Sequence, residues 1–353
     1  MNEYSPFLKF KDGELKALFN LLPEDRNIIV PLLELPRDNK YTEISLINRI
    51  NSNLKKMKNN LISDFIFFLD NLEVPDAIKI NGKDNYLYLL NEFSIFNIIP
   101  VIGFDRAETH NTIGINYANK KTKRIAFRIT QDYFDNIFAY KRDLENLCKR
   151  IYSDVSHILI LDCSYIDDNK IIEKCKTGIN RILEYIINLN IFSKIVITGS
   201  SIPASINDKV KTGTFVELNR NEVTIFKEIK KYDLKVNFVF GDYTVVSSEY
   251  SEVNMDPRAM FSIITPKVVY STLDSQYVNR GKKIKEHGFG QYFTQVEAII
   301  KKPFFRKDNS WGDKYLYEKV KNKTTNITPS SIIGPTVNSH MKFMIDEIKK
   351  GSI

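Results

Sequence analysis

The chain has 353 residues, of which 43% are hydrophobic and 27% are charged, values typical of a globular protein with a sizeable core. No run of about 18 uninterrupted apolar residues occurs, which excludes a membrane-spanning helix, and the N-terminus lacks the layout of a signal peptide. We therefore expect a cytoplasmic protein with Cys148, Cys163 and Cys175 reduced. The net charge of +8 permits attraction to a polyanion, but the lysines are spread along the chain, which favours an ordinary solvated surface.

Eight short apolar segments predict buried β-strands. They cover residues 28–35, 65–70, 98–105, 124–130, 157–162, 194–200, 236–242 and 261–270. Helix-like stretches lie between most of them, at residues 44–61, 86–96, 140–152, 170–189 and 220–232. Continuous apolar strands that alternate with helices are typical of a parallel sheet covered on both faces, and eight of them fit a closed (β/α)8 barrel.

This α/β pattern leaves one alternative open. Residues 109–123 predict only a short helix and residues 243–260 predict none, so a doubly wound open parallel sheet is the second interpretation. Because no repeat or flexible linker occurs, we expect one domain over residues 4–349, closed by extra C-terminal helices. In a closed barrel the first of the eight strands is central, which predicts that Leu32 and Leu33 are inaccessible to solvent.

Acidic residues lie at or just past the ends of five predicted strands: Glu34, Asp70, Asp105, Asp162 and Asp242. In a parallel barrel these ends meet at one rim, the C-terminal face that carries the active sites of such folds. Acids crowded in a low-dielectric site repel one another unless a cation, a basic side chain or a shared proton compensates them. Such oxygens suit Mg²⁺, Mn²⁺ or Ca²⁺, and a pair of them could act as general acid and base. The alternative is that they simply cap helices and end strands.

Basic side chains are expected at the same level of the barrel. Lys9, Arg37 and Arg106 lie near the ends of candidate strands, while Arg128 lies inside one, where a buried guanidinium needs an acidic partner. Two explanations remain open: an anionic substrate held by these groups, or an internal network of salt bridges. No glycine-rich phosphate loop, nucleophile elbow or zinc signature occurs.

Several short strings, taken in order, resemble a known family. The opening YSPFLKFKDGELKALFNL with IIVPLLELP, then FGDY, RGKK with GFGQY, SWGDKYLYE and NSH are similar to the bacteriophage beta-protein family. The resemblance implies a family found in phages and in mobile or accessory bacterial loci, with no established reaction. Its recurrent positions correspond here to Tyr4, Pro6, Lys9, Glu14, Glu34, Asp242, Tyr243, Arg280, Gly281, Trp311, Gly312, Asp313, Asn338 and His340. Family members commonly end this pattern with Asn-His-His, whereas this chain has Ser339 at the first histidine.

The strand ends and the resemblance together lead us to expect a polar site at the barrel rim. Its ligand is expected to be a nucleotide or nucleic acid, and its reaction metal-dependent hydrolysis of a phosphoester, as in a phosphodiesterase or nuclease. His340 would donate a proton to the leaving group. The prediction also brings Asp242, Arg280, Asp313 and His340 together around one cavity, with an acid as the partner of Arg280. The expected catalytic residues are Asp242, Asp313 and His340. The expected substrate-binding residues are Lys9, Arg280, Tyr243, Trp311 and Asn338, and the expected ligands of Mg²⁺ or Mn²⁺ are Glu34, Asp105 and Asp162.

Two features carry alternative interpretations. Trp311 is either a stacking platform for a base or a core anchor, and Gly312 permits a turn that aims Asp313 at the rim. The rival function is a non-catalytic module that recognises a phage or host protein in phage defence. Its contact patch would consist of exposed aromatic residues among Tyr243, Tyr250, Tyr277 and Tyr292.

Overall fold

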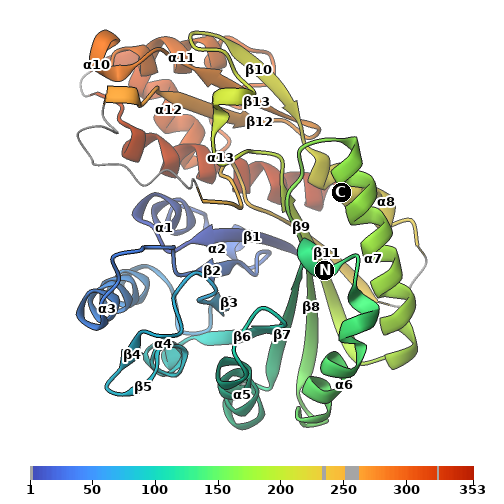
Figure 1. The fold of residues 1–353 in the computed structure, drawn as a ribbon. Helices are drawn as coiled ribbons and strands as arrows, with labels where there is room; N and C mark the ends of the chain where they lie inside the picture. The colour runs from blue at the N-terminus through green and yellow to red at the C-terminus, as the bar shows by residue number, and fades with distance from the viewer. Residues whose placement is uncertain (1–2, 233–235, 251–261, 324–325) are drawn as a thin grey trace.

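A closed barrel of eight parallel strands forms the centre of the molecule (Figure 1). The computed structural model describes residues 3–232, 236–250, 262–323 and 326–353. The ring closes because β1 pairs in parallel with both β2 and β11. The predicted (β/α)8-like barrel is therefore confirmed, and the open sheet is wrong. The barrel strands are β1 (Tyr4–Lys9), β2 (Leu32–Glu34), β3 (Ile66–Asp70), β6 (Asn97–Gly103), β7 (Arg124–Thr130), β8 (Ser156–Tyr165), β9 (Phe192–Ser200) and β11 (Asn237–Asp242).

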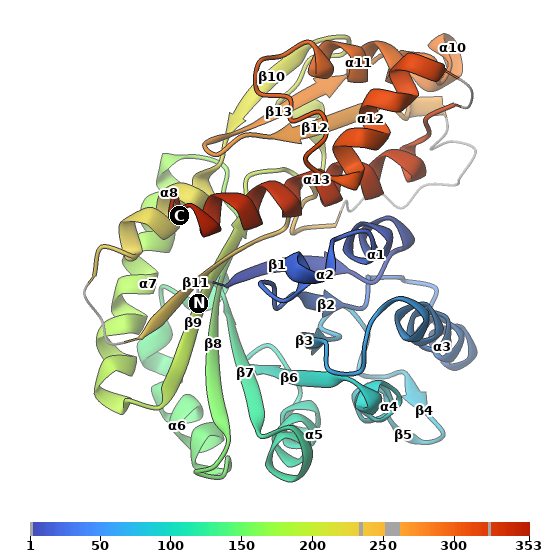
Figure 2. The ribbon, with the colours of Figure 1, turned by 180° about the vertical axis from the view of Figure 1, so that it is seen from behind.

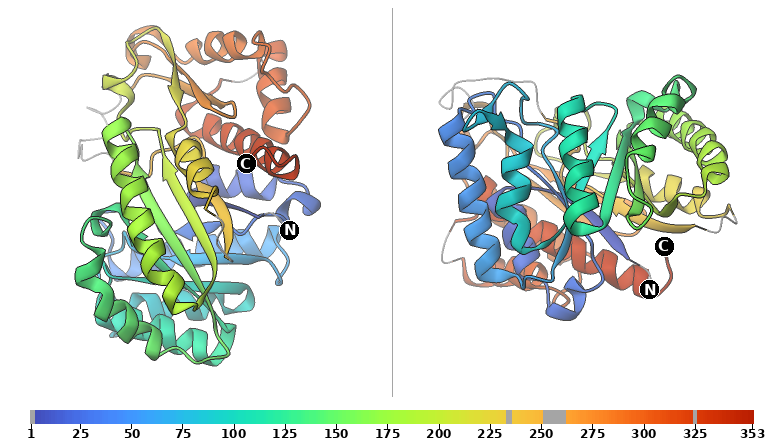
Figure 3. Two further views of the ribbon diagram at one scale, coloured as in Figure 1. Left: turned by 90° about the vertical axis from the view of Figure 1, so that its right-hand side faces the viewer. Right: turned by 90° about the horizontal axis from the view of Figure 1, so that it is seen from below.

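Helices surround the barrel strands, as two further views show (Figure 3). They form because apolar residues recur at helical spacing: in α3, Leu46, Ile50, Leu54 and Met57 are all buried against the strands. The helices are α1 (Asp12–Phe19), α2 (Pro23–Arg26), α3 (Glu43–Asn60), α4 (Asn85–Glu92), α5 (Glu108–Tyr117), α6 (Lys141–Lys149), α7 (Asn169–Leu189) and α8 (Asn221–Ile229), with a small hairpin of β4 (Lys79–Ile80) and β5 (Lys83–Asp84) before α4. Within the described residues, no helix combines the length and the apolar character needed to cross a membrane.

An antiparallel sheet with its own helices lies beside the barrel and was not predicted (Figure 2). Its strand order is β10 (Phe215–Asn219), β13 (Ser275–Arg280) and β12 (Lys267–Ser271). The helices that follow are α10 (Ile284–His287), α11 (Gln291–Ile300), α12 (Trp311–Asn322) and α13 (Pro329–Lys349). Helix α13 contacts α1 and β1 on the barrel as well as β12, so it joins the two parts.

The predicted number of barrel strands is correct because one strand was missed and another was wrongly included. The first barrel strand is β1, which the apolar pattern did not reveal because its sequence, YSPFLK, contains a proline and polar residues. The segment at 261–270 is not the eighth barrel strand: residue 261 lies outside the described part of the chain, and Lys267–Ser271 pairs antiparallel with β13. The burial prediction is confirmed, since Leu32 is 1% and Leu33 0% exposed.

The contact between α12 and α13 is so close that it requires a glycine. A Cβ atom on Gly312 would lie 1.9 Å from the carbonyl oxygen of Pro335. Gly312 lies in the first turn of α12, so it permits this contact rather than the turn that was predicted to aim Asp313 at the rim. Replacing Gly312 with alanine is expected to lower the free energy of unfolding by about 3 kcal/mol, measured by denaturant titration, because the helices must move apart. The control is Gly290→Ala, whose Cβ would meet nothing within 4 Å; equal effects of the two changes would contradict the prediction.

Candidate functional site at the barrel rim

A polar layer covers the C-terminal end of the barrel interior. Side chains alternate along a strand, so the residue two positions after an inward apolar residue also points inward. Phe7, Leu32, Phe68, Ala126 and Ile160 belong to the interior core cluster. The residues two positions further along the same strands are Lys9, Glu34, Asp70, Arg128 and Asp162. The predicted convergence of polar strand ends therefore takes place inside the mouth of the barrel.

Arg128 is the centre of this layer. Its Nη1 donates to Glu34 Oε1 at 3.0 Å and to Asp70 Oδ2 at 2.8 Å. Its Nη2 donates to Asp162 Oδ2 at 2.7 Å and to the Tyr243 hydroxyl at 2.9 Å, and that hydroxyl donates to Asp162 Oδ2 at 2.6 Å. All five side chains are buried. Burial would lower the pKa of Arg128, but Tyr243 and the surrounding carboxylates raise it well above its usual value.

A second guanidinium extends the layer. Arg106 Nη2 donates to Asp70 Oδ2 at 2.7 Å, and its Nη1 donates to Asp105 Oδ1 at 2.5 Å. Burial favours a raised pKa for Asp70, but Arg106 and Arg128 outweigh it and lower the pKa of Asp70 to about 2. Glu34 is different, since burial raises its pKa and Arg128 only partly opposes this. The acids of the rim are thus held in ion pairs with arginines.

This arrangement does not fit the predicted metal site. Glu34 and Asp162 both bind Arg128, whereas Asp105 binds Arg106. Within the described ranges, no group of three His, Cys, Asp or Glu side chains is placed to hold a metal ion. The guanidinium groups provide the compensating charge that a cation was expected to provide.

Asp242 lies outside this layer, on the other side of the barrel wall. The next residue, Tyr243, belongs to the interior cluster, so the Asp242 side chain points to the opposite face, toward Tyr4, Arg220 and His340. Asp242 accepts a hydrogen bond from the Tyr4 hydroxyl at 2.6 Å and from Arg220 Nη2 at 2.7 Å, and it lies 2.8 Å from His340 Nε2. Two of the four residues predicted to surround one cavity, Asp242 and His340, are therefore in direct contact. Both residues are 1% exposed, and neither lines the rim pocket described below.

The other residues of the predicted cavity lie elsewhere. Asp313 is buried at the start of α12, where it accepts hydrogen bonds from Tyr270 at 2.7 Å and from Ser339 at 2.6 Å. Arg280 does not pair with an acid among the described residues: its Nη1 donates to the Val210 carbonyl at 2.7 Å. The partner predicted for Arg280 is therefore wrong, because Arg280 ends a strand of the antiparallel sheet and does not follow a barrel strand.

Asn338 and Trp311 tie the C-terminal helices to α1. Asn338 accepts a hydrogen bond from the backbone N–H of Gly312 at 2.9 Å and donates to the Ala17 carbonyl at 2.8 Å. Trp311 is partly buried, with its ring 5.8 Å from that of Tyr315 and with the Lys16 ammonium 5.4 Å from its ring. These contacts favour the interpretation of Trp311 as a packing residue, and the substrate-binding roles of Trp311 and Asn338 stay predictions.

A pocket of about 440 Å³ opens beside the polar layer, and we call it the rim pocket. It lies where the loop after β1, the start of α1 and the segment after β11 meet β12 and α13. Its lining residues are Lys9, Lys11, Asp12, Gly13, Glu14, Ala204, Val245, Val246, Ser247, Glu249, Tyr250, Lys267, Val269, Ser330, Ile332, Ile333 and Thr336. A volume of this size suits a small-molecule ligand, and the barrel face is the one on which such folds bind ligands.

Lys9 and Glu14 form a linked pair in the rim pocket. Lys9 Nζ donates to the Ser247 carbonyl at 3.1 Å and lies 3.7 Å from the centre of the Tyr250 ring. The backbone N–H of Lys9 donates to Glu14 Oε2 at 2.6 Å. Burial lowers the pKa of Lys9 against the opposing charges of Glu14 and Glu34. Burial also raises the pKa of Glu14 to about 7, against the opposing effect of its hydrogen bond from Lys9.

The raised pKa of Glu14 predicts a pH-dependent stability. Because the folded state holds this proton more tightly than the unfolded chain, Glu14 costs no stability below about pH 4.5 and costs progressively more as the pH rises to 7. The variant Glu14→Gln is therefore expected to match the wild type at pH 4 and to exceed its free energy of unfolding at pH 8 by on the order of 2 to 3 kcal/mol. Urea titrations across this range would measure the difference. Glu24→Gln, on α2, is the surface control, and a difference for Glu14→Gln that stays constant with pH would contradict the prediction.

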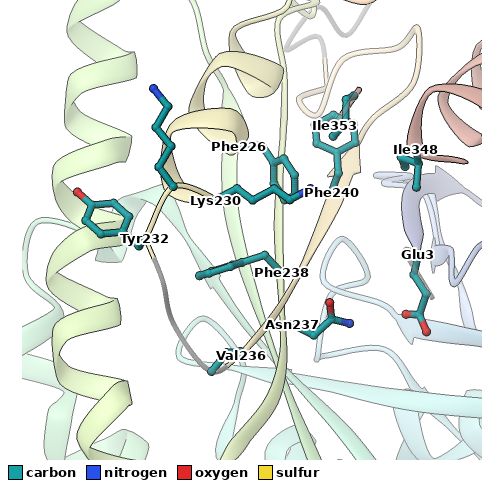
Figure 4. A pocket seen from close by; sticks show the side chains of 11 residues that line it. Glu3, Phe226, Lys230, Tyr232, Val236, Asn237, Phe238, Phe240, Ile348 and Ile353 are labelled. Atoms are coloured by element: carbon teal, nitrogen blue, oxygen red, sulfur yellow. The ribbon is translucent and has the colours of Figure 1, made fainter. Parts of the chain in front are cut away.

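Two other cavities are less suited to a ligand. One of about 270 Å³ lies beside Asp105, Arg106 and His110, and the guanidinium there is already bound to Asp70. Another of about 400 Å³ lies at the N-terminal end of β11, between α8 and the end of α13 (Figure 4). That face of a barrel serves stability rather than catalysis.

The comparison with known families agrees with the short strings. The profile of the Beta protein family matches residues 4–346. The chain belongs to the Beta protein family. The resemblance predicted from the sequence is confirmed over nearly the whole chain. The search of curated proteins found no match to this chain.

The sequence patterns did not mark two important residues of this chain. Arg220 is the basic partner of Asp242, but it precedes α8 in the string LNRNE and no strand end marks it. Lys267 lines the rim pocket, and its only signal is a charged residue beside the apolar run of β12. Both come from the part of the chain that was not recognised as a separate sheet.

Proposed function

We propose that this protein binds a small anionic ligand in the rim pocket, where Lys9, Lys11 and Lys267 hold the negative charge. One observation carries the proposal: Lys267 lines the pocket, and within the described part of the chain no acid or hydrogen-bond acceptor contacts its ammonium group. A partly buried cation without a counter-charge is unfavourable, so an anion that enters the pocket is stabilised by it.

The acids of the pocket leave this positive charge available. Asp12 is engaged by Lys56 at 2.6 Å, on the outer side of α1. Glu14 is only partly ionised near neutral pH because burial raises its pKa to about 7. Glu249 is the remaining acid of the lining, against three lysines. Phosphate groups and carboxylates are the anions that lysine side chains bind in proteins.

The same pocket is the place to test the predicted chemistry. If the anionic group is a phosphate, the expected ligand is a nucleotide or the end of a nucleic acid. If it is a carboxylate, the expected ligand is a small organic acid. Phosphoester hydrolysis stays a prediction, and turnover assays with nucleotides would test it. Two of the acids expected to hold the metal, Glu34 and Asp162, are bound to Arg128.

Most of the aromatic residues predicted to form a protein-recognition patch are buried. Tyr243, Tyr277 and Tyr292 are 3%, 1% and 2% exposed, so they form no surface patch with Tyr250. Recognition of a phage or host protein therefore has no aromatic surface of this kind to use.

A ligand panel tests the anion site. The melting temperature would be measured at constant ionic strength with inorganic phosphate, adenosine monophosphate and small carboxylates. An anion at about one hundred times its Kd is expected to raise the melting temperature by roughly 3 °C. The variant Lys267→Met should lose this shift, whereas Lys58→Met, on the exposed face of α3, should keep it. A panel in which no anion stabilises the wild type more than the Lys267→Met variant would overturn the proposal.

A further inference from the structure

The rim pocket lies between two hydrophobic cores. Val245 and Val269 belong to the core that surrounds the barrel, whereas Ile332 belongs to the core of the C-terminal sheet and its helices. Ile333 packs against both cores, and it is only half-buried, as is Val246. The pocket is therefore a gap in otherwise continuous apolar packing. The side chains around such a gap lack contacts that a hydrocarbon group would restore, and the same group would leave water by entering it.

The positive charge of the pocket adjoins this apolar wall. Lys267 and Val269 are two positions apart on β12, so their side chains leave the same face of the strand, and both line the pocket. Lys9 and Lys11 share one aromatic neighbour, since their Nζ atoms lie 3.7 Å and 5.3 Å from the centre of the Tyr250 ring. A ligand with a negative group at one end and an apolar body can thus meet both kinds of surface in a single pocket.

The lining favours an aliphatic body over a nucleobase. Among the described residues that line the pocket, Tyr250 is the only aromatic one, and Lys9 already lies over its ring. The Thr336 hydroxyl donates to the Ile332 carbonyl at 3.0 Å within α13. Protein sites for a base commonly offer free aromatic faces and hydrogen-bonding groups for its edges. The apolar lining residues here are all aliphatic: Ala204, Val245, Val246, Val269, Ile332 and Ile333.

We propose that the ligand of the rim pocket is an aliphatic anion: one negatively charged group held by the lysines, on a hydrocarbon chain that fills the gap between the two cores. The inference rests on the proposed function and adds the chemical class of the ligand's body. Burial of each methylene group is worth about a fourfold gain in affinity. The volume of about 440 Å³ suits a small organic ligand, so the gain should end once the chain fills the pocket.

A series of carboxylates of increasing length tests this class. The Kd of the whole chain for acetate, butanoate and hexanoate would be measured by calorimetry at pH 7 and constant ionic strength. Hexanoate has two more methylene groups than butanoate, so its Kd is expected to be about fifteenfold lower. Adipate has the length of hexanoate but a second carboxylate at the far end, and 1-hexanol has no charge. Each is expected to bind at least about tenfold more weakly than hexanoate, because one lacks the apolar end and the other the anionic group.

Variants of the pocket wall locate the hydrocarbon chain. Val246→Thr keeps the shape of a half-buried side chain but places a hydroxyl group on the wall, and it should weaken hexanoate about fivefold or more while leaving acetate unchanged. Ile333→Thr should act in the same direction. Ile47→Thr, at a half-buried position of α3 outside the pocket, is the matched control and should bind hexanoate as the wild type does. Lys267→Met should weaken both anions.

The outcomes separate this inference from the proposed function. If acetate and hexanoate bind equally well and Lys267→Met weakens both, the hydrocarbon chain is wrong and the anion site stands. If adenosine monophosphate binds more tightly than hexanoate, the ligand class is likewise wrong. If 1-hexanol binds as well as hexanoate and Lys267→Met changes neither, or if no compound binds, both proposals are overturned. A steep dependence on chain length that is lost in Val246→Thr and kept in Ile47→Thr supports both.

Discussion

Replacing Arg128 with methionine is expected to lower the free energy of unfolding by about 3 to 5 kcal/mol. The guanidinium binds Glu34, Asp70 and Asp162, all buried, so its removal leaves Glu34 and Asp162 without a counter-charge beside Asp70. Arg106 still neutralises Asp70, but it makes no contact with Glu34 or Asp162. Urea denaturation followed by circular dichroism would measure the loss.

Two variants make this prediction specific. Arg124→Met lies on the same strand at its N-terminal end, is only partly buried, and should cost about 0.5 kcal/mol or less. Adding Asp162→Asn to Arg128→Met removes one of the orphaned charges and should recover part of the lost stability. If Arg128→Met costs no more than Arg124→Met, the polar layer is not held together by this guanidinium.

The acids at the strand ends show which part of the site could be predicted from the sequence. A buried apolar run that stops on an acid predicted that Glu34, Asp70 and Asp162 would meet, and they do so on Arg128, the one basic residue found inside a predicted strand. What the pattern left open was the source of the compensating charge. A cation, a substrate and an arginine all satisfy the same electrostatic need, and only the arrangement in space separates them.

Side-chain parity explains why Asp242 does not belong to this group. A strand turns successive side chains to opposite faces, so a shift of one residue moves a side chain from the barrel interior to the helix layer. Val239 points inward with the core cluster, and Asp242, three positions later, points outward to Arg220 and His340. The apolar run at 236–242 does not alternate with polar residues, and the sequence therefore gave no sign of which face Asp242 would take.

The C-terminal strings of the family hold the structure together rather than line a pocket. Gly312 allows α12 to approach α13, Asn338 bonds both α12 and α1, and Asp313 joins Tyr270 to Ser339. Ser339 fills the position of a family histidine and donates to Asp313 at 2.6 Å. A recurrent string looks the same in a sequence whether it preserves chemistry or packing, so the strings alone do not separate a site residue from a packing residue.

Replacing Arg220 with methionine is the second change expected to cost about 3 to 5 kcal/mol of unfolding free energy. Arg220 is fully buried, donates from Nη2 to Asp242 at 2.7 Å and from Nε to Glu222 at 2.8 Å, and thereby links the start of α8 to the end of β11. The variant keeps both acids and loses their shared cation. Arg181→Met, on the exposed face of α7, is the matched control and should change the stability by about 0.5 kcal/mol or less.

The loss in the Arg220→Met variant should depend on pH in a defined direction. Burial would raise the pKa of Asp242, but His340 and Arg220 outweigh it and lower this pKa to about 2 in the folded protein. Because the folded pKa is below that of the unfolded chain, the ionised Asp242 stabilises the fold above about pH 4, and this contribution is lost as the pH falls toward 2. Without Arg220 the folded pKa of Asp242 moves up, so the difference between wild type and variant should be largest at pH 5 to 7 and shrink between pH 4 and 2. Urea titrations at pH 6 and pH 3 would show this, and a difference that grows on acidification would mean that the Arg220 guanidinium does not stabilise the ionised form of Asp242.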